Sequence, residues 1–188
     1  MLRVEASIRI ENVVASVTLN QRIDLKAVVK GNPGVEYRPE KFPGVVFRLK
    51  RPKTAILIFN TGKMVCTGAK SEKESIKAVT KLVRELKKSG IIIIGKPEIK
   101  VVNMVASGNL FGSIELEEAT YSLDKNMYEP EQFPGLIYRM DEPKVVFLIF
   151  SSGKIVCTGA TKEEDVYKAV AKLQKQLEEK ELISYDRA

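Results

Sequence analysis

Cysteine has the most reactive side chain in this sequence, and it occurs only at Cys66 and Cys157. The chain contains no histidine, which excludes Ser-His-Asp triads, Cys-His pairs and histidine-containing zinc sites. Two cysteines are weak grounds for a disulfide in an intracellular chain and too few for a metal site. No carboxylate cluster lies in the strand-like segments. The sequence therefore predicts a binding protein, not an enzyme, without metal or cofactor, in which both cysteines are small core residues.

The net charge of +7 is unevenly distributed along the 188 residues. Residues 1–91 carry 19 Lys and Arg against 8 Asp and Glu, or +11, whereas residues 92–188 carry 12 against 16, or −4. A basic excess indicates a polyanionic partner, and the acidic second half indicates that it also meets a partner of another kind. Without a signal peptide or an apolar run of about 18 residues, we expect an intracellular protein.

The chain repeats itself with a shift of 91 positions. Residues 37–70, "YRPEKFPGVVFRLKRPKTAILIFNTGKMVCTGAK", align with residues 128–161, "YEPEQFPGLIYRMDEPKVVFLIFSSGKIVCTGAT", and 19 of these 34 positions are identical. We therefore expect two copies of one unit, residues 1–91 and 92–188, in one continuous body. Two copies are too few for a solenoid.

Each copy has the pattern of five strands, a short helix and a long helix. In the first copy, residues 4–19 alternate as a strand does, and residues 23–31 predict a short helix. Three further strands, residues 45–50, 54–59 and 63–69, follow a turn-rich loop. Antiparallel pairing is expected, because tight turns such as Asn60-Thr61-Gly62 join neighbouring strands.

A capping box predicts where each long helix begins. Ser71 with Glu74 marks the first long helix, and Thr161 with Glu164 marks the second. One such helix per copy can cover only one face of the sheet, yet both faces of the strands are substantially apolar. The other face is therefore covered by protein, in a sandwich or a dimer, or it binds a partner.

Three pairs of strings carry a resemblance that covers essentially the whole chain. They are "EKFPGVVFRL" with "EQFPGLIYRM", "ILIFNTGKMVCTGAK" with "FLIFSSGKIVCTGAT", and "ENVVAS" with "VNMVAS". The chain resembles the TATA-box-binding protein family in its compact archaeal form. This resemblance implies an α+β fold: a saddle-shaped pseudo-twofold repeat, with a ten-stranded curved antiparallel sheet and four helices on the convex face. The concave face is then expected on the DNA minor groove.

The resemblance also implies roles for individual residues. Four phenylalanines match the family's intercalating wedges: Phe42, Phe59, Phe133 and Phe150. Minor-groove contacts are implied for Asn12, Val14, Leu57, Val65, Thr67, Asn103, Val105, Leu148, Val156 and Thr158. DNA-backbone contacts are implied for Arg48, Lys53, Lys63, Arg139, Lys144 and Lys154. In the acidic second loop, Glu129 and Glu131 are expected to contact transcription factor B.

The implied function is that of a general transcription initiation factor. It would bind the TATA box of a promoter, bend the double-stranded A/T-rich DNA, and recruit transcription factor B and, through it, RNA polymerase. The expected location is the cytoplasm, on chromosomal DNA, with no nucleus and no membrane. The family analogy leaves open a homodimer of the free protein.

Two other functions compete with this interpretation. One is a structural protein that dimerises through the sheet. It gives no reason for Phe, Asn, Thr and Lys or Arg to recur on the same face in both copies. The other is the saddle-like substrate-binding domain of a nucleic-acid-processing enzyme, which would need a catalytic constellation and a pocket for a flipped base.

Overall fold

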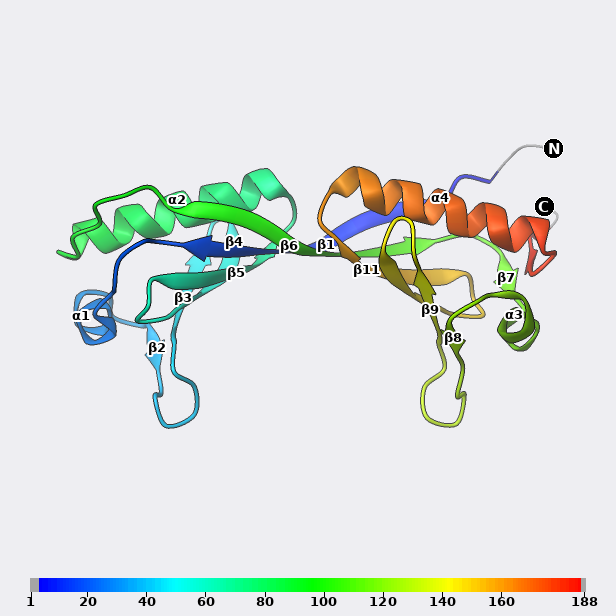
Figure 1. Ribbon diagram of the computed structural model, residues 1–188, viewed down its shortest axis with the longest axis horizontal. Helices are drawn as coiled ribbons and strands as arrows, with labels where there is room; N and C mark the ends of the chain where they lie inside the picture. The colour runs from blue at the N-terminus through cyan, green and yellow to red at the C-terminus, as the bar shows by residue number, and fades with distance from the viewer. Residues whose placement is uncertain (1–3, 187–188) are drawn as a thin grey trace. The chain divides into compact units, whose positions relative to one another are not determined.

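The computed structural model describes residues 4–186. The first elements are β1 (Ser7–Thr18), α1 (Leu25–Gly31), β2 (Glu36–Tyr37), β3 (Val45–Lys50), β4 (Lys53–Ile58), β5 (Lys63–Ala69) and α2 (Glu72–Lys88). They are followed by β6 (Glu98–Asn109), β7 (Ser113–Ile114), α3 (Leu116–Ser122), β8 (Asn126–Met127), β9 (Leu136–Met140), β10 (Val145–Ile149), β11 (Lys154–Ala160), α4 (Glu163–Glu179) and β12 (Ile183–Ser184). Figure 1 shows these elements along the chain.

Ten of the strands form one sheet, with the order β2-β3-β4-β5-β1-β6-β11-β10-β9-β8. Together with the four helices, this antiparallel sheet confirms the predicted α+β class built from two repeats. β7 and β12 pair separately as a second, two-stranded sheet. The sequence does not predict that small sheet, because two-residue strands are too short to show an alternating pattern.

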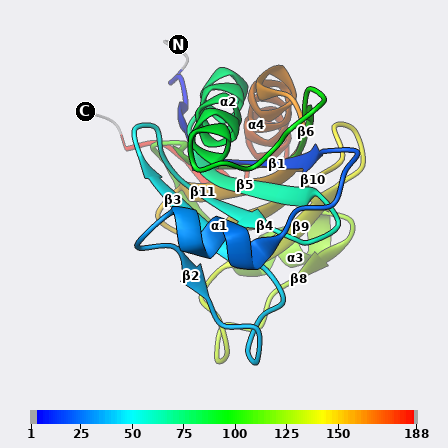
Figure 2. The ribbon, with the colours of Figure 1, turned by 90° about the vertical axis from the view of Figure 1, so that its left-hand side faces the viewer.

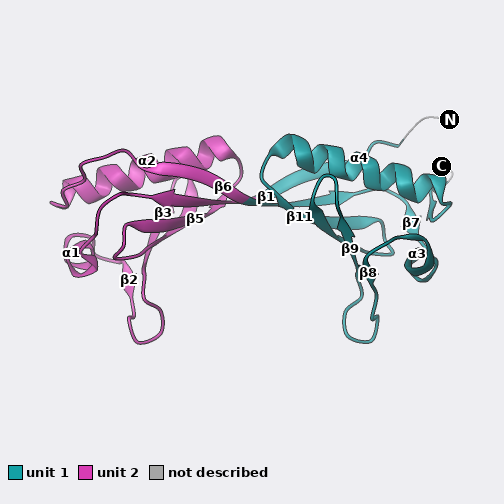
Figure 3. Cartoon of the chain, in the orientation of Figure 1, with its two compact units in different colours: residues 1–11, 103–188 teal, residues 12–102 magenta. Residues whose placement is uncertain are grey.

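The chain divides into two compact units that differ from the sequence repeats (Figure 3). One unit consists of residues 12–102, and the other of residues 1–11 with 103–188. We call them the 12–102 unit and the 103–188 unit. The boundaries cut through β1 and β6, so each of these strands contributes to both units.

In the 12–102 unit, α2 covers one face of the sheet (Figure 2). Val79, Leu82 and Leu86 recur at helical spacing and are fully buried together with strand residues such as Ile56 and Ile58. Each such side chain stabilises the fold by about 1.5–3 kcal/mol on burial. This packing decides which face of the strands remains uncovered.

The short helix α1 joins the same core. Asp24 caps its first turn, since the carboxylate accepts hydrogen bonds from the amides of Lys26 and Ala27 at 3.0 and 3.3 Å. At its other end, Asn32 Nδ2 donates to Ser89 Oγ at 3.1 Å, beside the end of α2. The predicted end of this helix near Gly31 is confirmed.

The predicted hairpin between β4 and β5 is also confirmed. Gly62 adopts a φ of 88°, and its carbonyl accepts a hydrogen bond from the Leu19 amide at 3.0 Å. A Cβ at this position would collide with the carbonyl oxygens of Leu19 and Gln21. Glycine is therefore required here by both conformation and space.

The prediction for the start of the long helices is correct in one copy and wrong in the other. Ser71 caps α2, and its hydroxyl accepts from the Glu74 amide at 3.1 Å. The N-cap of α4 is Lys162, not Thr161, and no side chain caps this helix. Lysine has no acceptor group, so the box with Glu164 does not form. Instead, three carboxylates in the first turn stabilise α4 through their interaction with the positive end of the helix dipole.

The 103–188 unit packs in the corresponding way. α4 buries Val166, Leu173 and Leu177 against its sheet, where Phe147 is fully buried. The buried amide of Gln174 donates to the Val4 carbonyl at 2.8 Å and to the Tyr185 hydroxyl at 3.0 Å. Within residues 4–186, no helix is long and apolar enough to cross a membrane.

Candidate nucleic-acid interface

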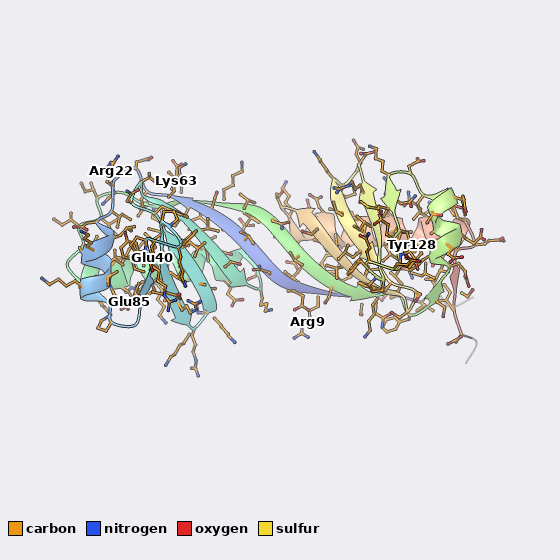
Figure 4. All side chains as sticks on the ribbon, turned by 90° about the horizontal axis from the view of Figure 1, so that it is seen from below. Arg9, Arg22, Glu40, Lys63, Glu85 and Tyr128 are labelled. Carbon is orange, nitrogen blue, oxygen red and sulfur yellow. The ribbon has the colours of Figure 1, made fainter. Side chains whose placement is uncertain are left out.

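In each unit the long helix leaves the opposite face of the sheet uncovered (Figure 4). The strands alternate between fully buried residues under the helix and half-buried residues on this open face. In β5, for example, Met64 and Cys66 are buried, whereas Lys63, Val65 and Thr67 belong to the open face. Along each strand, one set of alternating residues thus lies on the face covered by the helix, and the other set lies on the open face.

The open face of the 12–102 unit carries a row of three apolar side chains and one serine that crosses four strands. Val46 lies opposite Leu57, Leu57 opposite Val65, and Val65 opposite Ser16. Val14 is half-buried on the same face of β1. Leu57, Val65 and Val14, for which the resemblance implies groove contacts, are therefore brought together on one surface.

A second row lies beside the first. Arg48 faces Ala55, and Ala55 faces Thr67. The 103–188 unit has both rows at the corresponding positions: Ile137, Leu148, Val156 and Ser107 in the first row, and Arg139, Val146 and Thr158 in the second, where Val105 also lies opposite Thr158. The open face is thus built twice with nearly the same side chains.

The Asn12 side chain is held in one orientation by the protein itself. Its Oδ1 accepts a hydrogen bond from the Gly68 amide at 2.7 Å, and its Nδ2 donates to Thr67 Oγ1 at 3.0 Å. Because a backbone N–H can only donate, the amide cannot be flipped. One N–H of Nδ2 has no partner in these bonds, so the side chain presents a fixed donor.

Asn103 makes the same bonds in the other unit, to the Gly159 amide at 2.7 Å and to Thr158 Oγ1 at 3.2 Å. Each glycine lies at a bulge of the strand pairing and has a φ of 100° or 107°. The sequence indicates that these amides need a partner, but it does not identify the threonine and glycine 55 and 56 positions away.

The four phenylalanines form two edge-to-face pairs. The ring centroids of Phe42 and Phe59 are 5.6 Å apart, and those of Phe133 and Phe150 are 5.9 Å apart. Phe42 and Phe133 remain 36% and 40% exposed. Each pair is a half-exposed aromatic edge beside the open face, rather than part of the core.

The glycine of each Phe-Pro-Gly loop makes room for the rings, a role that we do not predict from the sequence. A Cβ at Gly135 would lie 2.8 Å from Phe133 and 3.1 Å from Phe150. At Gly44, a Cβ would lie 2.9 Å from Phe42. The doubled "FPG" string is the signal that could have revealed this role.

The predicted cations lie on or at the ends of the open-face strands. Lys53 and Lys63 are the exposed first residues of β4 and β5, and in the alternation of these strands both belong to the open face. Arg48 has its guanidinium 3.6 Å from the Glu36 carboxylate, and both side chains are largely exposed. Such an exposed pair contributes about 0–1 kcal/mol, so Arg48 can exchange it for another anion at little cost.

The corresponding cations of the 103–188 unit are Arg139, Lys144 and Lys154, and all three are exposed. Nearby, Lys125 Nζ donates to both oxygens of Asp141 at 2.7 and 2.8 Å. This hydrogen bond and the positive charge of Lys125 lower the pKa of the Asp141 carboxyl. Asp141 replaces the Lys50 of the first copy, so the second unit is less basic at this edge.

Glu129 and Glu131 lie in the exposed loop between β8 and β9. The Glu129 carbonyl accepts from the amides of Gln132 and Phe133 at 3.0 Å, and this turn leads directly to the phenylalanine pair. Arg38 makes the same turn in the first copy. The loops therefore share a backbone conformation and differ in the charge that they present.

Cys66 and Cys157 are free thiols buried on the helix-covered face, as predicted. Burial raises the pKa of the Cys66 thiol from 9.0 to about 11, with a smaller contribution from Glu74, and raises that of Cys157 to about 12. Within the described part of the chain, no three His, Cys, Asp or Glu side chains gather in a way that could hold a metal ion.

Comparison with known proteins gives a consistent result. The family model described as "Transcription factor TFIID (or TATA-binding protein, TBP)" matches residues 7–89 and 98–180. A TATA-box-binding protein from Sulfolobus acidocaldarius is 57% identical over 169 residues, which is 90% of this chain and 86% of that protein. Another from Pyrodictium occultum is 57% identical over 168 residues, covering 89% and 84%.

The structural comparison agrees. The solved structure of "Methanococcus jannaschii TBP" matches with a TM-score of 0.84 and 48% identity, covering 92% of this chain and 99% of that chain. The matches in sequence and in structure extend over both repeats, and the chain therefore belongs to the TATA-box-binding protein family.

Proposed function

We propose that the chain is a general transcription initiation factor that binds TATA-box promoter DNA through the open sheet faces of its two units. Family membership supports promoter binding and a role without catalysis. The observation that carries the proposal is the open face itself. It combines a row of mostly apolar side chains, an asparagine with a fixed donor, and a phenylalanine pair, and it is built twice.

The chemistry of this face fits the DNA minor groove. The floor of the groove presents the N3 and O2 acceptors of A·T pairs in a sparse pattern, and guanine adds an amino group. A mostly apolar surface tolerates either order of A and T but leaves that amino group without an acceptor. The free N–H of Asn12 and Asn103 can donate to N3 or O2. We infer a preference for A/T-rich DNA in either base order.

We further propose that each phenylalanine pair enters a base step and bends the duplex. Members of the TATA-box-binding protein family are themselves the standard example of such wedging, which costs a few kcal/mol per step. Burial of one phenylalanine returns about 1.5–3 kcal/mol, so a pair offsets much of that cost. The half-exposed rings of Phe42 and Phe133 have this surface available.

Cations around the apolar rows would position the protein on the phosphates. Lys53 and Lys63 lie at opposite ends of neighbouring strands, and Lys144 and Lys154 do so in the second unit. Contacts with phosphate carry no sequence information but make affinity depend on salt. The protein would act inside the cell, on chromosomal DNA.

Bending is tested by fluorescence transfer on short duplexes labelled at both ends, with an A/T-rich or a G/C-rich centre, at matched salt. We expect transfer to rise only with the A/T-rich duplex, and the rise to disappear in Phe133→Ala/Phe150→Ala. Tyr121→Ala, which removes an aromatic side chain that is 88% exposed on α3, is the matched control. Equal binding to both duplexes, or binding without a change in transfer, would reject the wedge.

The acidic loop of the second unit is proposed to recruit transcription factor B and, through it, RNA polymerase. Glu129 and Glu131 are exposed on a turn whose counterpart in the first unit begins with Arg38. Glu129→Lys/Glu131→Lys should abolish the supershift that factor B produces on protein–DNA complexes, while DNA binding persists. Glu40→Lys, at the position equivalent to Glu131, is the control. An unchanged supershift in the double variant would refute this role.

A further inference from the structure

A cavity with a volume of about 420 Å³ lies between α4 and the segment at the start of the described chain. Glu5 and Ile8 line it from that segment, and Tyr167, Val170 and Gln174 line it from α4. All of these residues belong to the 103–188 unit, which includes residues 1–11. The cavity is therefore formed within one unit, beside the helix and away from the rows of the open face assigned to DNA.

Gln174 is a buried polar side chain whose oxygen has no partner in the protein. The residue is 4% exposed, and its Nε2 donates to the Val4 carbonyl and to the Tyr185 hydroxyl. Because a carbonyl oxygen can only accept, the orientation of the amide is fixed. Oε1 accepts no hydrogen bond from residues 4–186, and it is not sealed from solvent. Since Gln174 lines the cavity, this oxygen is an acceptor presented to a ligand there.

The other groups of the cavity also favour a cation with an aliphatic stem. Glu5 contributes a carboxylate and is the charged residue among the described residues that line the cavity. Tyr167 is 47% exposed, and the face of a tyrosine ring attracts an ammonium group. Ile8 and Val170 supply apolar surface for a hydrocarbon chain. A ligand that fits these groups carries N–H donors and a positive charge at the end of an alkyl chain.

The first copy of the repeat shows that the fold does not require these groups. Three of them are changed there: Lys96 stands in place of Glu5, Ile76 in place of Tyr167 and Val83 in place of Gln174. A lysine repels a cation, and the side chain of valine has no acceptor. The cation-binding character is therefore a property of the 103–188 unit alone.

A second carboxylate lies farther along the same face of α4. Glu163 is four positions before Tyr167, so the two side chains are neighbours on the helix surface. Glu163 and Gln174 are eleven positions apart, which is roughly 16 Å along the helix axis. A lysine side chain carries one ammonium group and cannot reach both ends of this distance. An extended molecule with several ammonium groups joined by short alkyl linkers can.

We propose that this cavity binds a free linear aliphatic polyamine. One terminal ammonium group donates to Gln174 Oε1 and to the Glu5 carboxylate. The alkyl chain lies against Ile8 and Tyr167, and a further ammonium group approaches Glu163. The net charge of +7 opposes the binding of a polycation to the chain as a whole, so binding has to come from these local groups. A bound polyamine would join the segment that contains Glu5 to α4 and stabilise the folded protein.

Binding is tested by calorimetry on the full chain without DNA, at fixed ionic strength, with spermine as the polyamine. Butylamine tests a single ammonium group, and hexaamminecobalt(III) tests charge without an alkyl chain. A peptide of alternating lysine and glycine tests a protein ligand. We expect spermine to bind about tenfold or more tightly than each of the other three, because its linked ammonium groups reach both carboxylates.

Two variants at exposed positions of the cavity locate the binding. Glu5→Gln removes the carboxylate and should weaken the binding of spermine by about fivefold or more. Tyr167→Ile gives α4 the residue found in α2 and should weaken it by about threefold or more. Glu117→Gln and Tyr121→Ile make the same changes at exposed positions of α3 and should stay within about twofold of the parent. A urea titration confirms that each variant folds.

Several results would overturn the proposal. Absence of spermine binding would reject it directly, and equal affinity for hexaamminecobalt(III) would show attraction of charge alone. Tighter binding of the lysine peptide would make the cavity a docking site for a protein. Equal losses in the cavity variants and the α3 variants would place spermine elsewhere, as would amide NMR shifts that lie outside residues 4–8 and α4. Since no DNA is present, a failure of promoter bending would leave these readouts unchanged.

Discussion

The amide of Asn103 illustrates how one residue can be fixed by the fold and still face a ligand. Replacing it by Asp keeps the oxygen that accepts from the Gly159 amide but removes both N–H donors. We predict that Asn103→Asp folds normally and binds an A/T-rich duplex at least about tenfold more weakly, because a lost donor and an added charge both oppose binding. Fluorescence anisotropy measures the affinity. Gln176→Glu is the control, because it adds the same charge on α4, away from the open face, and keeps the oxygen that accepts from the Tyr138 hydroxyl.

The buried thiols predict how stability depends on pH. Folding raises the pKa of Cys66 to about 11 and that of Cys157 to about 12, whereas both thiols ionise near 9.0 when unfolded. The contribution of the two neutral thiols to the free energy of unfolding is complete below pH 9. It is lost as the pH rises toward and through the raised pKa values, because the thiols ionise more readily in the unfolded chain. Urea unfolding at pH 8 and pH 10.5 measures how much the free energy of unfolding decreases between these pH values. We predict that this decrease is smaller in Cys66→Ala/Cys157→Ala than in the parent. An identical loss would contradict this account.

At the scale of the element, the Phe-Pro-Gly loop depends on the missing Cβ of its glycine. In Gly135→Ala the new methyl group would lie 2.8 Å from Phe133 and 3.1 Å from Phe150, so the ring pair must move. We predict that this variant bends an A/T-rich duplex less than the parent and binds it about threefold to tenfold more weakly. Gly95→Ala, where a Cβ meets no atom within 4 Å, should behave as the parent does. Equal bending by both variants would show that ring placement is not critical.

The two long helices differ at their first turn, and this difference predicts opposite effects on stability. Ser71→Ala removes the hydroxyl that accepts from the Glu74 amide and should lower the free energy of unfolding by about 1 kcal/mol. Lys162→Ser gives α4 the side-chain cap that this helix lacks, and it should raise the free energy of unfolding by about 0.5–1 kcal/mol. Urea denaturation measures both, and a loss of stability in Lys162→Ser would show that the lysine has another role.

These caps also mark the limit of what the sequence could predict. The repeat, the hairpin glycine and the long helices follow from sequence patterns. The face that each strand buries does not, because both faces of the strands are substantially apolar. The partners of Asn12 and the space beneath Phe133 depend on residues that meet only in the folded chain. The compact units could not be predicted either, because β1 and β6 read as single strands but contribute to both units. The prediction that Thr161 caps α4 is wrong because Lys162, and not Thr161, is the residue equivalent to Ser71.

For the whole molecule, the similarity of the two open faces raises the question of how direction on a promoter is chosen. Both rows occupy corresponding positions in the two units and differ only at Val46 and Ala55, which become Ile137 and Val146. Contact through these faces therefore gives little preference for either orientation. The charges do differ, with +11 in residues 1–91 and −4 in residues 92–188. Such asymmetry acts through long-range fields that salt screens, and it can supply only a modest bias.

We therefore predict that the protein alone binds an asymmetric A/T-rich element in both directions, and that transcription factor B selects one of them. A DNA-cleaving chelate attached through Thr61→Cys or Ser152→Cys reports the direction, because these exposed turn positions correspond in the two units and the native thiols are buried. Without factor B, each probe should cut both flanks of the element within about threefold of one another. With factor B, each probe should cut one flank, and the two probes should cut opposite flanks. A strong bias in the protein alone would mean that the small differences between the open faces already encode direction.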